Sequence, residues 1–213
     1  MKIPFYPNAP DWLHCMQACA KMILKYHFPE KDFSFDELDN MMGVKKGKLV
    51  TIPQVIVALD KLGLKCKYVT KLGNGITYAE YLEMGMKKYF EKTLGESAVE
   101  VISPEVQIQF SKEAYNKGLV EEKRISFQDL KNYFDKGCLI LAIVDFNKLN
   151  NTQKDFLGHG VLITDINEFI HFHDPGEPPT PNRKLDKDFF MTILNDSTKE
   201  KSILVVFGKK NER

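Results

Sequence analysis

The sequence has no long hydrophobic run and almost no net charge. Its longest apolar stretch, CLILAIV at 138–144, has the length of a strand, whereas a membrane-spanning helix needs about 20 apolar residues. Lys and Arg number 30 and Asp and Glu 29, a net charge of +1. Such a balance provides no basic surface for nucleic acid or for an anionic membrane, so we expect neither as a partner.

Cysteines and targeting signals are also scarce. The four cysteines, Cys15, Cys19, Cys66 and Cys138, are too few and too scattered for a disulfide framework, which predicts reduced thiols. The opening MKIPF leads into proline and asparagine instead of an apolar run, so no signal peptide is recognisable. We therefore expect a cytoplasmic protein. Nothing in the sequence indicates its oligomeric state.

The 213 residues contain ordinary proportions of hydrophobic and charged residues, 43% and 28%, and predict a single domain over 1–213. Helical spacing of apolar residues predicts helices at 13–28, 33–43, 52–63, 77–95, 126–137 and 185–194. Alternation and short apolar runs predict strands at 64–70, 138–146, 160–166, 169–174 and 202–208. The expected class is α+β, with an N-terminal helical half and a C-terminal, mostly antiparallel sheet.

Two consecutive strands, GHGVLITDI and FIHFHD, predict a hairpin with a defined register. A two-residue turn at 167–168 pairs Ile166 with Phe169 and places Ile163 opposite Phe172. Counting back along both strands brings the start of the first strand beside the end of the second.

In this register His159 and Asp174 lie diagonally across from one another on one face. Diagonal neighbours in an antiparallel pair are roughly 7–8 Å apart, within reach of side chains. The same face carries Val161, Ile163 and Phe172, so it is predicted to face the core and to shield an imidazole–carboxylate pair from water.

The segment DWLHCMQACAKMILKY places Cys15 at the start of a predicted apolar helix. A thiol at a helix N-terminus is acidified by the macrodipole, and an adjacent imidazolium lowers its pKa further. His159 would accept its proton, and Asp174 would hold the other ring nitrogen. The chain order Cys, His, Asp, with a long interval before the histidine, is typical of papain-type thiol enzymes.

Four segments carry a resemblance to a known family. CMQACAKMIL is similar to a CGPAxLxMVL segment, and GHGVLITDIN to GHYVVVTGID. FIHFHDPGEPP resembles a strand that ends in Asp-Pro, and KGCLILAIVD resembles a GkPvIvlvd strand. All four patterns belong to the bacteriocin-processing, double-glycine leader type of cysteine peptidase, a papain-like family.

The resemblance implies a papain-like cysteine peptidase fold and a Cys-His-Asp triad. By position, Cys15 becomes the nucleophile, His159 the base and Asp174 the residue that orients the imidazole. The implied reaction proceeds through an acyl-enzyme thioester on a peptide or small amide substrate and requires no cofactor and no metal. Residues at about 72–125 form an insertion, where the resemblance is weakest.

The sequence departs from the family at two places next to the cysteine. The family has Gly-Pro after the nucleophile, where this chain has Met16-Gln17. It also has an oxyanion-stabilising glutamine six residues before the cysteine, where this chain has Ala9. Asn8 and Gln17 are the candidates to replace that donor, beside the backbone N–H of the cysteine itself. A catalytically weak or inactive peptide-binding domain and an acyltransferase therefore stay open as alternative functions.

Other interpretations of these residues also stay open. Cys15 is compatible with plain core packing, Asp174 with turn formation, and Cys15 and Cys19 with a metal site that includes a histidine. Cys19 is expected to pack in the core, one turn below Cys15. His171 and His173 form a His-x-His pair that is expected on the outer face, exposed or packed against a partner. The loops at 147–157 and 177–183 are expected to shape specificity together with the insertion.

Overall fold

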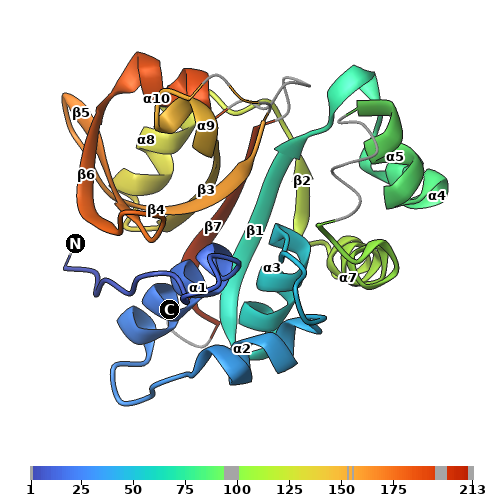
Figure 1. Cartoon of the computed structure of the whole chain (residues 1–213), viewed down its shortest axis with the longest axis horizontal. Coiled ribbons are helices and arrows are strands. Elements are labelled where there is room, and N and C mark those ends of the chain that lie inside the picture. Colours follow the sequence, from blue (N-terminus) through green and yellow to red (C-terminus); the bar gives the residue numbers. More distant parts are fainter. Residues whose placement is uncertain (1, 94–100, 153, 155, 195–200, 211–213) are drawn as a thin grey trace.

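A seven-stranded sheet forms the centre of the molecule, with the strand order β2-β1-β7-β3-β4-β5-β6 (Figure 1). The computed structural model describes residues 2–93, 101–152, 154, 156–194 and 201–210. Only the β1–β2 pair is parallel; every other neighbouring pair is antiparallel. The strands are β1 (Leu64–Lys71), β2 (Val120–Glu122), β3 (Leu139–Asp145), β4 (Gly158–Ile166), β5 (Phe169–Asp174), β6 (Thr180–Asp186) and β7 (Lys201–Lys209).

Helices cover both faces of this sheet. They are α1 (Cys15–His27), α2 (Phe35–Met42), α3 (Ile52–Lys61), α4 (Tyr78–Met84), α5 (Met86–Thr93), α7 (Pro104–Asn116), α8 (Phe127–Asp135), α9 (Phe146–Leu149) and α10 (Lys187–Ile193), with the short 3-10 helix η1 (Gly73–Gly75). Within the described ranges, none of these helices is both long enough and apolar enough to cross a bilayer.

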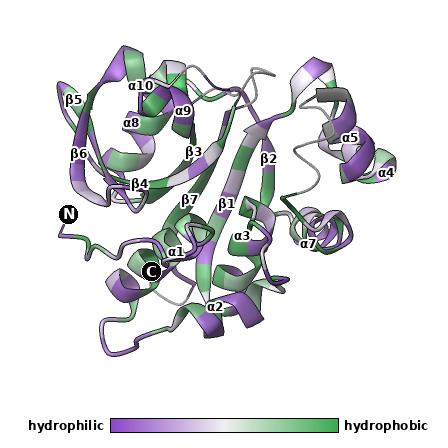
Figure 2. Ribbon diagram, viewed as in Figure 1, coloured by the Kyte–Doolittle hydropathy of each residue, from purple (hydrophilic) through white to green (hydrophobic). Residues whose placement is uncertain are grey.

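Alternating side chains of the central strands build two cores. Leu141 and Leu162 pack on one face of the sheet with α1, α2 and α3, whereas Ile140 and Ile163 pack on the other with α8 and α10. This alternation follows from the two-residue period of a strand. Hydrophobic residues dominate β7, while the edge strand β6 and helix α5 are hydrophilic (Figure 2).

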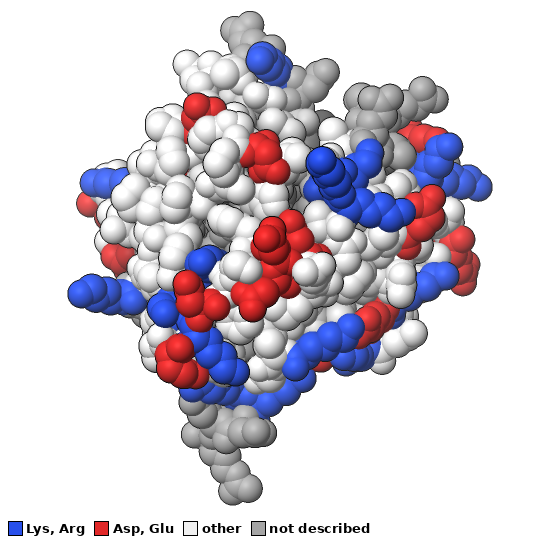
Figure 3. Space-filling model, turned by 60° about the horizontal axis from the view of Figure 1, so that its bottom comes forward, with Lys and Arg blue, Asp and Glu red and all other residues white. Residues whose placement is uncertain are grey.

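Acidic and basic side chains both occur on the face shown in Figure 3. Lys and Arg residues lie among Asp and Glu residues across the face that contains the lower end of the molecule (Figure 3). This mixed pattern agrees with the net charge of +1.

The predicted α+β class is confirmed, as are most of the predicted elements. The helix expected at 77–95 is divided at Gly85, whose φ of 83° ends α4 before α5 begins; positions 94–95 lie outside the described residues. The loop expected at 177–183 is wrong from Thr180 onward, because this polar segment pairs with β5 as the edge strand β6. The loop expected at 147–157 begins within α9.

The insertion at 72–125 lies at one end of the sheet. Its described part forms η1, α4, α5, α7 and β2, which gather beside β1 and α3 (Figure 1). Because β1 and β2 are at the opposite end of the strand order from β5 and β6, the insertion is separated from the β4–β5 hairpin.

The register of that hairpin is confirmed at one end and corrected at the other. Ile163 pairs with Phe172, as predicted. The predicted pairing of Ile166 with Phe169 is wrong: Ile166 pairs with Ile170, because a bulge between Ile163 and Asp165 shifts the register by one residue. The bulge lies on the turn side, so it leaves the alignment near His159 intact.

Candidate active site

Cys15 is the first residue of α1, and its side chain is buried against β4. The thiol hydrogen-bonds the imidazole of His159 and lies within reach of the backbone N–H groups of Gly160 and Met16. Helix α1 begins here because the preceding turn at 9–12 is closed by a hydrogen bond from the Trp12 N–H to the carbonyl of Ala9, 3.0 Å long.

The absence of a side chain at Gly160 allows α1 to approach β4. A Cβ atom at this position would lie 2.6 Å from the Sδ of Met16 and 3.6 Å from the Met16 Cα. Helix α1 and strand β4 therefore meet at Met16 and Gly160, where the glycine leaves room for the methionine side chain. This close approach brings the thiol of Cys15 to the imidazole of His159.

The second ring nitrogen of His159 is held by Asp174. The Nε2 atom lies 2.7 Å from the Oδ1 of Asp174, and the two residues are only 5% and 1% exposed. The N–H of Gly176 also donates to Oδ1, at 2.9 Å. The structure therefore brings together all three residues that the sequence identifies as the candidate triad, Cys15, His159 and Asp174.

The environment changes the pKa values of the thiol and the imidazole in opposite directions. Burial alone would raise the pKa of Cys15, but the hydrogen bond to His159, the charge of that imidazole and the nearby N–H groups together lower it. Burial works against a charged imidazole, yet the hydrogen bonds to Asp174 and Cys15 raise the pKa of His159 to about 9. Both changes favour a thiolate–imidazolium pair.

The other cysteines differ from Cys15 in this respect. Burial raises the pKa of Cys138, brings that of Cys66 to about 12, and places that of Cys19 well above its usual value. Cys19 is completely inaccessible, one turn below Cys15, in agreement with the predicted core position. Cys15 is therefore the one cysteine of the four whose surroundings favour the thiolate.

Asp174 has a further partner that the sequence did not reveal. The Nη1 of Arg183, on β6, donates to Oδ2 of Asp174 at 2.8 Å. Burial raises the pKa of Asp174, but His159, the Gly176 N–H and Arg183 lower it, with a net decrease. Arg183 belongs to the segment predicted as a loop, so no periodicity pointed to it; only the pairing of β6 with β5 places it here.

The two candidate oxyanion donors occupy different surroundings. Asn8 lies beside the site: its N–H donates to the carbonyl of Pro175 at 2.9 Å, and its Oδ1 accepts from the N–H groups of His14 at 2.7 Å and Ala9 at 2.9 Å. Gln17 is completely buried, and its Nε2 donates to Asp39 of α2 at 2.8 Å. The side-chain amide of Gln17 thus donates to α2, whereas the hydrogen bonds given for the Asn8 side chain are accepted by its Oδ1.

His14 anchors the start of α1 to α2. Its Nδ1 lies 2.8 Å from Asp11 and its Nε2 3.0 Å from Asp39. Because ionised carboxylates only accept, both ring nitrogens donate and the imidazole is protonated. Burial opposes this charge, but the two carboxylates raise the pKa of His14 overall.

His173 holds the N-terminal segment against β5. Its Nε2–H donates to the carbonyl of Ile3 at 3.1 Å, and its Nδ1 accepts from the N–H of Asn182 at 3.2 Å. The ring also contacts Phe5, with centroids 5.2 Å apart. His171 and His173 do not converge on a common site, and among the residues that the structure describes no three His, Cys, Asp or Glu side chains are placed to hold a metal ion.

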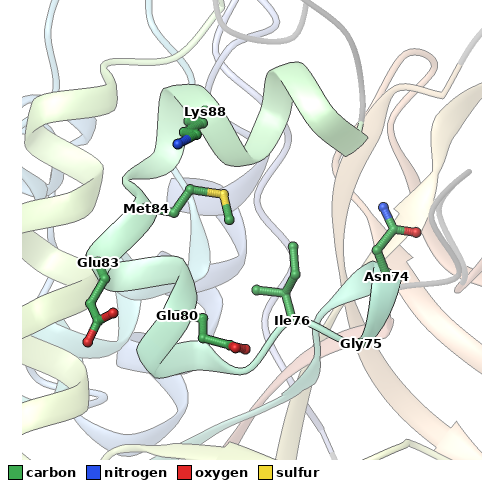
Figure 4. Close-up of a pocket in the computed structure, with 7 residues that line it drawn as sticks. All are labelled: Asn74, Gly75, Ile76, Glu80, Glu83, Met84 and Lys88. Atoms are coloured by element: carbon green, nitrogen blue, oxygen red, sulfur yellow. The ribbon is translucent and has the colours of Figure 1, made fainter.

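A separate hollow lies in the insertion, which gathers at the end of the sheet opposite to β5 and β6. It measures about 510 Å³ and is lined by Asn74, Gly75, Ile76, Glu80, Glu83, Met84 and Lys88 (Figure 4). The carboxylate of Glu80 is engaged at the start of α4, where it accepts from the N–H and hydroxyl of Thr77. The residues that line this hollow all belong to the insertion, and none of them is a candidate triad or oxyanion residue.

Comparisons with known proteins do not identify a family or an activity for this chain. No protein-family model and no curated protein sequence matches the chain. Among solved structures, the chain is similar to the peptidase domain of Streptococcus ComA, a bifunctional ABC transporter involved in a quorum-sensing pathway. The identity is 13%, the match covers 95% of this chain and 96% of that one, and the TM-score is 0.47. A likeness this distant assigns no activity, so function has to be inferred from the residues of this chain.

Proposed function

We propose that this protein is a thiol hydrolase of the cysteine peptidase type, with Cys15 as nucleophile, His159 as proton carrier and Asp174 as the residue that orients the imidazole. The observation that carries the proposal is the buried, continuous hydrogen-bond chain from the thiol through the imidazole to the carboxylate. Papain-like enzymes share this arrangement, in which the thiol lies at a helix N-terminus and the histidine and its partner lie on neighbouring strands.

The first half of the reaction forms an acyl-enzyme. The thiolate of Cys15 bonds to the amide carbonyl carbon, and the carbonyl electron pair moves to the oxygen. The N–H of Cys15 and the amide nitrogen of Asn8 are the donors proposed for that oxyanion. When the carbonyl re-forms, the C–N bond breaks, and the leaving nitrogen takes its proton from the imidazolium of His159.

The second half releases the acyl group. Neutral His159 accepts a proton from water while the water oxygen bonds to the thioester carbon. The C–S bond then breaks, Cys15 leaves as thiolate, and the imidazolium is restored. Asp174 retains its charge throughout and holds the ring through Nε2.

Two exposed apolar side chains lie close in the sequence to the reacting residues. Trp12, 43% exposed, precedes Cys15 by three positions, and Leu157, 44% exposed, precedes His159 by two. Trp12 adopts a left-handed backbone conformation, with φ of 63°, which is unfavourable for a bulky side chain unless the surroundings enforce it. We propose that a peptide substrate places an apolar side chain against this rim.

Alkylation by iodoacetamide at neutral pH tests the proposal. Cys15 is expected to react first, and His159→Ala to slow it by about 10²-fold, because the base that supports the thiolate is lost. Cys66→Ala is the matched control, since it removes a similarly buried thiol on β1 and should leave the labelling of Cys15 unchanged. Cys15 reacting no faster than Cys66 and Cys138 would contradict an activated nucleophile.

Product analysis distinguishes the functions that share this triad. A peptide substrate incubated with and without an added amine yields only acid for a hydrolase, whereas an amide of the added amine identifies an acyltransferase. A Cys15→Ala variant that retains full biological activity would instead identify a binding domain on the same scaffold.

A further inference from the structure

We propose that Arg183 is a positioning residue of this site: its guanidinium fixes the carboxylate of Asp174 and, through it, the orientation and protonation of His159. The catalytic consequence of this proposal rests on the proposed function, but the effect on His159 does not.

The guanidinium of Arg183 is held at several points. Its Nη1 donates to Oδ2 of Asp174 at 2.8 Å and lies 3.2 Å from the Oδ1 of Asn150. Its Nη2 donates to the carbonyl of Leu149 at 2.8 Å. The last two partners lie at the end of α9, so the planar fork has one orientation in which all three contacts are made.

The sheet register directs this side chain to the site. Arg183 pairs with Phe172 across β5 and β6, and side chains two residues apart along a strand share a face. Arg183 is therefore a diagonal neighbour of Asp174, as Asp174 is of His159. Three consecutive strands, β4, β5 and β6, thus contribute one member each to a row of alternating charge, imidazolium, carboxylate and guanidinium.

The two carboxylate oxygens of Asp174 accept hydrogen bonds from different partners. Oδ1 accepts from His159 and from the N–H of Gly176, whereas Oδ2 accepts from Arg183. A carboxylate this deeply buried is costly unless donors satisfy both oxygens. With Oδ2 fixed by Arg183, the carboxylate cannot turn, and Oδ1 stays directed at the ring.

Arg183 also opposes the effect of Asp174, whose negative charge raises the pKa of His159. The ionisable groups around this imidazole are Cys15 and Cys19 on α1, Asp174 on β5 and Arg183 on β6. Arg183 is a permanent cation on the far side of the carboxylate, so it disfavours a second positive charge on the ring. Removing it should make His159 harder to deprotonate and leave its ring less firmly directed at the thiol of Cys15.

The test compares Arg183→Gln, Arg183→Lys and Lys184→Gln in the full chain. Lys184→Gln is the matched control, since it removes a cation from the next position of β6, where the ammonium lies 3.5 Å from the ring centroid of Phe169 instead of at the site. Two quantities are measured: the titration midpoint of His159 by NMR of the imidazole protons, assigned with His159→Gln, and the alkylation rate of Cys15 against pH.

Arg183→Gln is expected to move the His159 midpoint to higher pH. It is also expected to slow alkylation at neutral pH by up to about 10²-fold, because an imidazole that is misplaced by about 1 Å supports the thiolate of Cys15 less well. Arg183→Lys keeps the charge but not the fork, so the midpoint should stay closer to that of the wild type while the rate still falls. Lys184→Gln should change neither quantity.

Two results overturn the proposal: a His159 midpoint unchanged in Arg183→Gln, or an equal change in Lys184→Gln. If Arg183→Gln does not fold, Asn150→Ala decides, because it loosens the guanidinium without touching Asp174 and should move the midpoint in the same direction by less. If wild-type Cys15 alkylates no faster than Cys66, the proposed function fails, yet the His159 midpoints still decide the role of Arg183.

Discussion

The Nε2 of His159 and the Oδ1 of Asp174 lie 2.7 Å apart in a region closed to solvent. An ionised carboxylate can only accept, so Nε2 carries the proton of this bond. That leaves Nδ1 as the ring nitrogen that meets the thiol of Cys15. The carboxylate therefore selects both the tautomer and the direction of the imidazole.

This coupling predicts the pH dependence of hydrolysis. Attack needs the thiolate of Cys15, whose pKa is lowered, and departure of the amine needs protonated His159, whose pKa is raised to about 9. Activity should rise with pH as the thiolate forms and fall as pH passes about 9, where the imidazolium loses its proton. Measurement of kcat/KM against pH gives both limits, the pH at which the thiolate forms and the pH at which the imidazolium loses its proton.

Alkylation of Cys15 separates the two limits, because it needs only the thiolate. Its rate should rise at the lower limit and should not fall above about pH 9. A single rise near pH 8.5, the value of an ordinary thiol, would contradict a paired thiolate and imidazolium.

Gly176 is predicted to be essential for the geometry of the same pair. The Cβ of an alanine would lie 2.9 Å from Oδ1 of Asp174 and 3.0 Å from Nε2 of His159, closer than such contacts allow. Gly176→Ala should therefore displace the pair and lower the hydrolysis rate by about 10²-fold, the usual effect of a 1 Å misplacement. Gly158→Ala is the control, since the nearest atoms to its Cβ would belong to Ile143 and Phe156 at 3.5 Å, an ordinary contact. Equal rates in the two variants would refute this prediction.

The elements that the sequence predicted well are those with local signals. Helix α2 begins at Ser34 because its hydroxyl accepts from the N–H of Glu37 in a capping box, and it ends at Gly43 because that residue adopts φ of 63°. The pairing of Ile163 with Phe172 followed from counting back along the two strands from the turn expected at 167–168. Cys15, His159 and Asp174 could be predicted for the same reason: each lies at the end of an element with a clear pattern.

The parts that the sequence did not reveal depend on contacts between distant segments. β6 is polar and contains Pro181, so its strand conformation comes from pairing with β5 and not from its own propensity. Arg183 was missed together with this strand. The bulge after Ile163 has no sequence signal that we recognise. The directions of the amide groups of Asn8 and Gln17 depend equally on neighbours brought in by the fold.

The contact between Gly160 and Met16 predicts a paired effect on stability. Gly160→Ala would place a Cβ 2.6 Å from the Sδ of Met16, and the buried methionine has little room to move. Overpacking of this kind costs about 1–3 kcal/mol, measured by urea unfolding. Met16→Ala leaves a cavity when introduced alone, but combined with Gly160→Ala it removes the clash. The double variant should therefore be more stable than the sum of the single effects predicts, and strict additivity would show that the two residues do not interact.

His14 predicts a dependence of stability on pH. Its pKa is raised in the folded chain by Asp39 and Asp11 against the effect of burial, so the protonated form is the one that folding stabilises. The contribution is complete below the unfolded pKa of about 6.5 and is lost as pH rises through the higher folded pKa. His14→Gln should accordingly lower the free energy of unfolding by about 1–2 kcal/mol at about pH 6, a value reduced by the half-exposed Asp11, and by much less at about pH 9. Urea unfolding of both proteins at the two pH values measures the difference, and titration of Cys15 and His159 cancels because both proteins contain them. A loss of the same size at both pH values would mean that His14 contributes packing and not charge.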